Sequence, residues 1–427
     1  MTGTADGSAA RPEDGVLAAL ECAERIGPEL NAFVALHRDR ALAEARRASG
    51  PLAASPVAIK DNIDEAGCVC AAGCAAYLDR RPEQDAEVVQ RLRAAGAVII
   101  GRCNMHELAD GVTSEASAFG PVHNPWRPGF TPGGSSGGSA ACVAAGCVKI
   151  SLGTDTGGSI RIPASLCGVV GFKPSAGRVP TRGVMPLSTS LDHVGPLAIS
   201  VPEAARAMAV LADGWSAQRA AASPPRGVRI GVLEGFGREA EPGVGSCFDE
   251  ALALLERAGA MLLPARIDDL ARGLGLLSAI YAPEAAAYHE KRLAERPGDF
   301  GEAVREDLRR GLAADPGRRE RALAERAELA AAVLGLMDEL CLELLACPTT
   351  PCTALPHGAP APHRYLQFTC PFNLTGQPAA SVPAGLFGGL PVGLQLVGRQ
   401  GADEQVLAAA ADLEQRLGFV CAPVIRP

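Results

Sequence analysis

Lysine is scarce in this 427-residue sequence: only Lys60, Lys149, Lys173 and Lys291 accompany 36 arginines among its 40 basic residues. The scarcity matters because arginine keeps its proton in proteins, whereas a buried lysine can lose it. Lys60 directly follows the apolar residues 57–59. A lysine in such a segment, in a chain that otherwise uses arginine, indicates a role that arginine could not fill. The alternative interpretation is that the position of Lys60 has no functional significance, since four lysines must occur somewhere in the chain.

Positive surface charge and long apolar runs are also missing. The formal net charge is −8 and the pI is about 5.5, which gives no basic surface for nucleic acid or anionic lipid. The longest apolar stretches, such as residues 143–146 and 391–398, are far shorter than the ~20 residues that cross a bilayer. Residues 1–7 lack the basic and apolar parts of a secretory signal. We therefore expect a cytoplasmic protein with no nucleic-acid or membrane partner.

Metal-binding spacings are absent although the chain has 14 cysteines. The cysteines are scattered through a long sequence, which is typical of reduced and mostly buried thiols. Only Cys68, Cys70 and Cys74 lie close together, and they have neither a C-x2-C spacing nor an evident fourth ligand. We expect no metal and no other cofactor.

A succession of strand and helix patterns predicts an α/β fold. Short apolar runs at residues 56–59 and 97–100 indicate buried strands, with a helix over residues 85–95 between them. Further strands are expected at 148–152, 228–233, 261–264, 344–347, 380–384 and 392–397, and helices at 139–146, 247–258, 319–342 and 403–417. The alternation predicts one large sheet with helical crossovers.

The remaining segments flank this sheet. Residues 1–13 are polar and rich in Gly and Ala, so we expect disorder. Residues 14–50 have the apolar spacing of two amphipathic helices joined near residues 27–28. The charged region at about 269–326 is expected to be a helical excursion over the sheet edge, because its apolar content is too small for a core of its own. We expect residues 14–427 to form a single domain.

Two glycine-serine turns, Gly133–Ser139 and Asp155–Arg161, carry the strongest chemical signal. Glycines around a serine allow close approach to a ligand and let amide N–H groups converge on one point, which can hold an oxyanion. A phosphate loop would need a lysine directly after its last glycine. Gly134, Ser136 and Gly138 fit the nucleophile elbow, but that motif requires a preceding strand and three prolines precede it here. The histidines offer no evident triad partner.

Several further motifs accompany these turns, and together they resemble the amidase signature family. Ala58-Ile59-Lys60-Asp61-Asn62 lies upstream of the turns, and the second turn is part of the segment Gly153–Arg161. The match extends through Gly101–Met105, Phe119–Pro121, Gly168–Pro174, Leu191–Asp192, Gly195–Pro196 and Pro391–Gln395. It covers most of the chain from about residue 50 onward. The resemblance implies an α/β fold in which a large mixed central β-sheet has helices on both faces.

The resemblance also implies catalytic roles. Ser159 would be the nucleophile, Ser135 a bridging serine preceded by a cis peptide bond, and Lys60 the base. A serine needs a base to take its proton, and a lysine can serve once burial lowers its pKa. The family's oxyanion donors would be backbone N–H groups of the turn, carried by Thr156, Gly157, Gly158 and Ser159 itself. Three more matching residues would support the site: Ser136, Arg161 and Asp155.

The expected reaction is hydrolysis of a small carboxylic amide through an acyl-enzyme. One alternative is the glutaminase subunit of a tRNA-dependent amidotransferase, to which the first 200 residues are also similar. Residues 281–311 look more like those of general bacterial amidases and ureide-type hydrolases, which favours an enzyme that works alone. Another alternative is a catalytically silent binding protein, although all three triad residues are present. The partner would be a small-molecule amide, and the family suggests a homodimer.

Overall fold

The computed structural model describes residues 11–223, 227–234, 236, 240–360 and 362–426, and it contains one mixed sheet of eleven strands. The strand order is β1-β3-β2-β4-β6-β5-β10-β11-β9-β7-β8. The strands are β1 Phe33–Leu36, β2 Pro56–Lys60, β3 Val98–Cys103, β4 Ile150–Asp155, β5 Val170–Lys173, β6 His193–Ala198, β7 Arg229–Glu234, β8 Met261–Arg266, β9 Leu344–Pro348, β10 Ala379–Phe387 and β11 Leu390–Gly398. The predicted large mixed sheet is confirmed.

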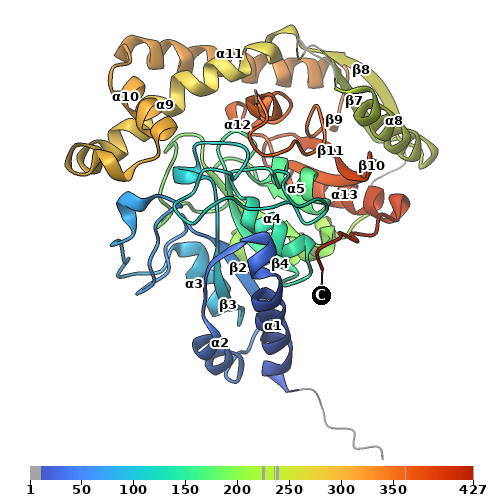
Figure 1. The fold of residues 1–427 in the computed structure, drawn as a ribbon. Helices are drawn as coiled ribbons and strands as arrows, with labels where there is room; N and C mark the ends of the chain where they lie inside the picture. The colour runs from blue at the N-terminus through green and yellow to red at the C-terminus, as the bar shows by residue number, and fades with distance from the viewer. Residues whose placement is uncertain (1–10, 224–226, 235, 237–239, 361, 427) are drawn as a thin grey trace, which may run out of the picture.

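Helices cover both faces of this sheet (Figure 1). The α-helices are α1 Pro12–Leu30, α2 Arg38–Ala45, α3 Glu87–Ala94, α4 Gly137–Ala144, α5 Arg161–Cys167, α6 Val201–Leu211, α7 Ala217–Ala220, α8 Pro242–Arg257, α9 Gly273–Glu295, α10 Glu302–Leu312, α11 Pro316–Glu339, α12 Pro371–Leu374 and α13 Asp403–Leu417. Short 3-10 helices lie at Ala75–Tyr77, Glu107–Ala109, Asp268–Arg272, Pro297–Asp299 and Pro362–Leu366. No helix in the described ranges is long and apolar enough to span a membrane.

The two faces of the sheet carry separate hydrophobic cores because successive side chains of a strand point to opposite sides. In β2, Val57 and Ile59 belong to the core covered by α3, α6, α8 and α13. Ala58, between them, belongs to the opposite core, formed with α1, α2, α4 and α5. All three side chains are fully buried. A strand buried on both faces reads as a continuous apolar run, which explains why it was recognisable in the sequence.

The sheet also aligns the segments that carry the chemical signal. Strands β2 and β4 are parallel neighbours, with Val57 opposite Ile150 and Ile59 opposite Leu152. Lys60 ends β2 and Asp155 ends β4. Parallel neighbours reach the same edge of a sheet at their carboxyl ends, so the lysine lies beside the second glycine-serine turn.

The N-terminal flank differs from the prediction. Two helices are present as predicted, but α1 runs unbroken from Pro12 to Leu30 and includes Pro28, so the predicted junction near residues 27–28 is wrong. Strand β1 and helix α2 follow, and β1 pairs antiparallel with β3 at the sheet edge. Residues 1–10 of the segment predicted to be disordered lie outside the described residues, whereas Pro12 and Glu13 are already helical. A four-residue edge strand is too short for apolar spacing to separate it from a helix.

Strands β5 and β6 and helices α6, α7 and α12 were also missed. Strand β6 contains Gly195 and Pro196, which normally argue against an internal strand. Glycine is required there because a Cβ at position 195 would lie 2.2 Å from the carbonyl oxygen of Phe172 in the neighbouring β5. Close packing of two strands thus overrides the local propensity.

Helices α9, α10 and α11 lie together along one edge of the molecule (Figure 1). Leu276, Leu277 and Ile280 of α9 pack into a core shared with Phe368 and with β9 and β11 of the sheet. The helices of this region therefore bury apolar surface against the body of the chain and place part of α9 beside the turn after β4.

Candidate active site

Lys60 lies at the end of β2 with its side chain completely buried. Its Nζ donates hydrogen bonds to Ser135 Oγ and to Thr154 Oγ1, each at 2.7 Å. Burial lowers the pKa of Lys60 to about 7, and the negative charges of Asp192 and Asp155 oppose that shift. A substantial fraction of the lysine is therefore the neutral amine near neutral pH, as a general base requires.

Ser135 lies in the first glycine-serine turn, where the Gly134–Ser135 peptide bond is cis. Ser159 lies in the second turn, and the two turns are in contact because Ser136 N donates to the Ser159 carbonyl at 3.3 Å. Within the described residues, Ser159 Oγ has no hydrogen bond to Ser135 Oγ. The structure therefore joins Lys60 to Ser135 directly and places Ser159 beside them at the wall of a cavity.

The turn after β4 presents free backbone donors. No described residue accepts a hydrogen bond from the amides of Gly157, Gly158 or Ser159, while their carbonyl oxygens have partners. Thr369 Oγ1 donates to the Gly157 carbonyl at 2.7 Å and Ile162 N donates to the Gly158 carbonyl at 2.7 Å. These hydrogen bonds fix the orientation of the carbonyl groups, and the N–H groups of the turn remain available to bind an oxyanion.

Asp155 and Arg161 fix the two ends of this turn in a fully buried ion pair. Arg161 Nε and Nη2 donate to the two carboxylate oxygens of Asp155 at 3.0 and 2.9 Å, and Ile160 N donates to Asp155 Oδ2 at 3.1 Å. Burial alone would raise the pKa of Asp155, but the Arg161 guanidinium holds it well below its usual range. The pair acts on the position of the turn, not on the reacting atoms.

Ser136 is turned away from the reacting groups. Its Oγ donates to the Thr154 carbonyl at 3.1 Å and accepts from Thr154 N at 3.4 Å. It therefore holds the first turn against the end of β4, which agrees with the supporting role expected from the sequence and disfavours the nucleophile-elbow alternative.

Two residues at the site were not singled out from the sequence. Thr154 Oγ1 accepts a hydrogen bond from Lys60 Nζ and another from Asn62 Nδ2 at 3.2 Å. Asp192 accepts from Thr156 Oγ1 at 2.5 Å, and burial raises the pKa of Asp192 to about 6. A threonine that ends a strand and an aspartate in a loop have no distinctive local pattern, so only the motif Leu191–Asp192 could have drawn attention to the second.

Ser159 opens into a cavity of about 280 Å³. Thr156 and Gly157 line it beside the nucleophile candidate, and Leu277 and Tyr281 of α9 also line it. The cavity brings the serine, the free amides and a partly apolar wall to one place, where the carbonyl of a small amide could meet both a nucleophile and its oxyanion donors.

Comparison with known proteins identifies the family. A family model described as Amidase matches residues 14–407. The chain is a member of the amidase signature family. It is 38% identical to the A subunit of the glutamyl-tRNA(Gln) amidotransferase of Symbiobacterium thermophilum, with 93% of each chain covered.

Solved structures of amidase signature proteins agree over nearly the full length. One described as an amidase has a TM-score of 0.88 and 37% identity, covering 96% of this chain and 97% of its own. A 6-aminohexanoate cyclic dimer hydrolase complexed with substrate has a TM-score of 0.90 and 29% identity, covering 98% and 96%. The amidase signature fold and carbon-nitrogen hydrolase class follow from these matches.

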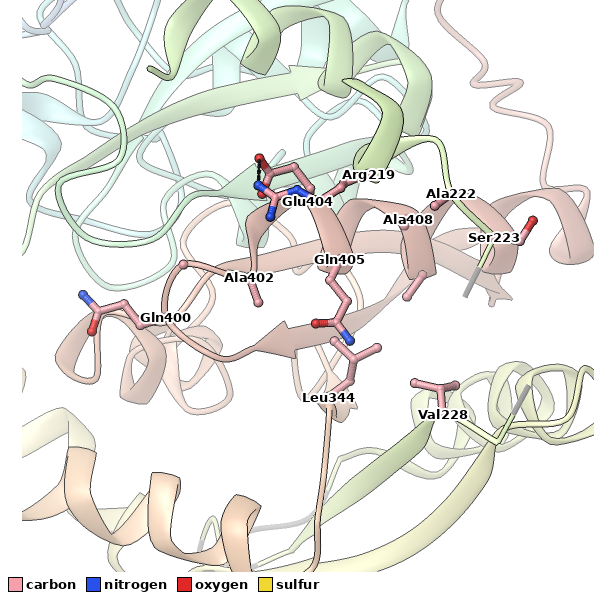
Figure 2. A pocket seen from close by; sticks show the side chains of 12 residues that line it. Arg219, Ala222, Ser223, Val228, Leu344, Gln400, Ala402, Glu404, Gln405 and Ala408 are labelled. Atoms are coloured by element: carbon pink, nitrogen blue, oxygen red, sulfur yellow. Dashed lines mark hydrogen bonds and ion pairs between the residues drawn. The ribbon is translucent and has the colours of Figure 1, made fainter. Parts of the chain in front are cut away.

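A different hollow of about 560 Å³ shares no lining residue with the cavity at Ser159 (Figure 2). It is lined by Arg219, Leu344 and the start of α13, including Glu404. Arg219 Nη2 donates to Glu404 Oε1 at 3.1 Å, so these charges satisfy each other. None of the nine residues predicted for the amidase site lines this hollow.

The cysteine cluster has no common ligand site. Cys74 Sγ donates to a backbone carbonyl at 3.7 Å, whereas Cys68 Sγ lies 3.8 Å from His37 Nε2. His37, Glu65 and Cys68 do group closely, which the sequence did not indicate. The Glu65 carboxylate is already neutralised by arginines 40, 93 and 102. We therefore interpret this grouping as part of a partly buried ion-pair network centred on Glu65.

Proposed function

We propose that this chain hydrolyses small carboxylic amides through an acyl-enzyme on Ser159. The observation that carries the proposal is the 2.7 Å hydrogen bond from the fully buried Lys60 to Ser135, beside Ser159 and the free amides of its turn. A lysine whose pKa lies near 7 supplies a base, the serine supplies a nucleophile, and the turn supplies charge stabilisation. Ser159 and its turn line the cavity, and Lys60 acts on them from behind the lining through Ser135.

The proposed step balances without a cofactor. Neutral Lys60 Nζ takes the proton of Ser135 Oγ while Ser135 Oγ takes the proton of Ser159 Oγ, which attacks the amide carbon. The amide oxygen gains negative charge and meets the N–H groups of residues 156–159. Collapse expels ammonia or an amine with the proton returned through Ser135. Water then releases the acid from Ser159, and the same relay activates it.

The Ser159→Ala variant tests the nucleophile. We expect loss of ammonia release from amide substrates by at least ~10³-fold, because no covalent intermediate can form. Ser246→Ala, at an exposed position in α8 that bonds only its own helix, is the matched control and should keep full activity. A fluorophosphonate should label Ser159 of the wild type. Unchanged ammonia release in Ser159→Ala, or label on Ser136, would contradict the assignment.

A second candidate function is the glutaminase subunit of a tRNA-dependent amidotransferase. It is favoured by the identity of 38% with the A subunit of such an enzyme over 93% of both chains. In that role the chain would release ammonia from glutamine in a complex. Copurification with partner subunits, together with glutamine-dependent ammonia release that needs them, would support it over the stand-alone amidase.

A further inference from the structure

The cavity beside Ser159 has a predominantly apolar lining. Its larger apolar side chains come from four separate segments of the chain, and they are Val112, Leu187, Leu277 and Leu366. Apolar side chains offer no hydrogen bond to a polar acyl group, so binding there favours hydrocarbon. Discrimination between substrates must then come from the few polar groups in the same wall.

The charged groups in that wall are acidic. Asp110 and Asp307 line the cavity, and no arginine or lysine is found among the described residues that do. Asp307 is paired with Arg310, which lines a neighbouring hollow on the other side of Tyr281. Asp110 has no ion pair with any described residue. The positive charge of Arg310 acts on Asp110 from outside the cavity lining and lowers its pKa, so Asp110 is a negative charge in the lining that a bound substrate meets without a direct ion-pair partner.

Asp110 is available to a ligand. The nearby Tyr281 hydroxyl lowers the pKa of Asp110, although burial has the larger effect and raises it to about 6. The group is thus mostly a carboxylate at neutral pH and fully so above pH 8. A carboxylate has about four acceptor positions, so one tyrosine leaves acceptors free to bind substrate N–H groups.

We propose that Asp110 selects the substrate: the site takes amides whose apolar acyl part carries an N–H donor group, such as an amine, ureide or second carboxamide, and it rejects amides that carry a carboxylate. This inference rests on the proposed function and deepens it. A substrate carboxylate would face Asp110 in a pocket whose described lining holds no lysine or arginine to receive it, and at pH 8.5 the lining histidines His106 and His363 carry little charge, so like charges disfavour binding.

Succinamide and succinamate form a matched pair for the test, because they have the same shape and differ only in a far carboxamide or carboxylate. Ammonia release is measured at pH 8.5, where Asp110 is ionised. We expect kcat/KM for succinamide to exceed that for succinamate by ~100-fold or more. The Asp110→Asn variant keeps the shape and removes the charge, so the ratio should fall by at least ~10-fold. Asp249→Asn, exposed on α8, should leave it unchanged.

Protection of Ser159 from fluorophosphonate labelling gives a second readout that does not need turnover. Succinamide should protect the wild type at a much lower concentration than succinamate. In Asp110→Asn the concentrations of the two amides that give equal protection should lie closer together. An unchanged ratio in a folded Asp110→Asn variant, or no protection by either amide at millimolar concentration, would overturn the proposal. A preference for succinamate that Arg310→Met removes would assign selection to Arg310 instead. The two proposals fail in different ways. Full activity in Ser159→Ala would contradict the proposed function, whereas an unchanged substrate ratio in an active Asp110→Asn variant would contradict the selection alone.

Discussion

Single side chains differ in role according to what surrounds them, and the two fully buried lysines show it. Burial lowers the pKa of both Lys60 and Lys173 to about 7. Lys173 Nζ donates to the Gln377 and Pro174 carbonyls, which have no proton to exchange. Lys60 Nζ instead meets two hydroxyl groups, and one of them belongs to Ser135. The partner, not the burial, makes Lys60 the candidate base.

The pH profile should report the titration of Lys60. Because burial lowers its pKa to about 7, the neutral amine predominates above pH 7 and is lost below it. We expect kcat/KM to fall ~10-fold per pH unit below about 6 and to level off above about 8. Steady-state ammonia release between pH 5 and 9 measures this, with melting curves to exclude unfolding. Lys60→Arg should be as inactive as Lys60→Met, and a flat profile or an active arginine variant would remove Lys60 from the role.

Replacing only one partner of the buried Asp155–Arg161 ion pair should strongly lower the stability of the protein. Arg161→Met leaves a buried carboxylate without its guanidinium, which typically costs about 3 to 5 kcal/mol of unfolding free energy. Chemical denaturation measures the loss, and Arg309→Met on the exposed side of α10 is the control. Adding Asp155→Asn should recover part of the stability because the uncompensated charge is then gone. Equal losses in Arg161→Met and in the control would contradict the assigned role.

At the scale of elements, the turn between β4 and α5 carries most of the site. Strand β4 fixes its start at Asp155 and helix α5 begins at Arg161, so the ion pair between them spans the turn. Residues of α12 and of the loop before it, including Thr369, close over its outer side. The glycines of the turn let this neighbouring segment approach closely, which leaves little tolerance for a side chain.

Gly158→Ala tests that tolerance. A Cβ at position 158 would lie 2.2 Å from Thr369 Oγ1 and 2.7 Å from Ile162 Cδ1, and the φ angle of +148° is one that other residues rarely adopt. We expect the turn to shift and kcat to drop by ~100-fold or more, the typical effect of losing an oxyanion donor. Gly275→Ala, at an open position of α9, is the matched control. Activity within a few-fold of wild type in Gly158→Ala would argue against this turn as the oxyanion site.

At the scale of the whole molecule, the site is built from segments distant in the sequence. Lys60, Ser135 and Ser159 come from a strand end and two turns, and Leu277 and Leu366 complete the cavity from the C-terminal half. The described chain thus supplies a candidate for the base, the nucleophile, the oxyanion donors and the substrate-binding wall. Such a site does not require a residue from another protein.

We therefore propose that the chain needs no other subunit, and the resemblance to the family separately suggests that it forms a homodimer. The purified protein should release ammonia from a neutral amide such as butyramide by itself. Light scattering should give twice the chain mass of 43.8 kDa. Activity that appears only after the other components of an amidotransferase are added would contradict independence, and a monomeric mass with full activity would contradict the dimer alone.

The sequence alone determined the class of fold, and its resemblance to the family supplied the candidate triad residues. Apolar runs such as residues 57–59 are readable because a strand buried on both faces needs them, and the glycine-serine turns are readable because few residues tolerate such backbone geometry. The tertiary structure decided what depends on distant partners. Only the folded structure showed that Thr154 accepts a hydrogen bond from Lys60 and that Gly195 and Pro196 lie inside strand β6. It also showed that Asp110 lines the cavity without a direct ion pair to a described residue. The charge and contacts of a side chain in a pocket depend on segments far apart in the chain, and local pattern does not contain that information.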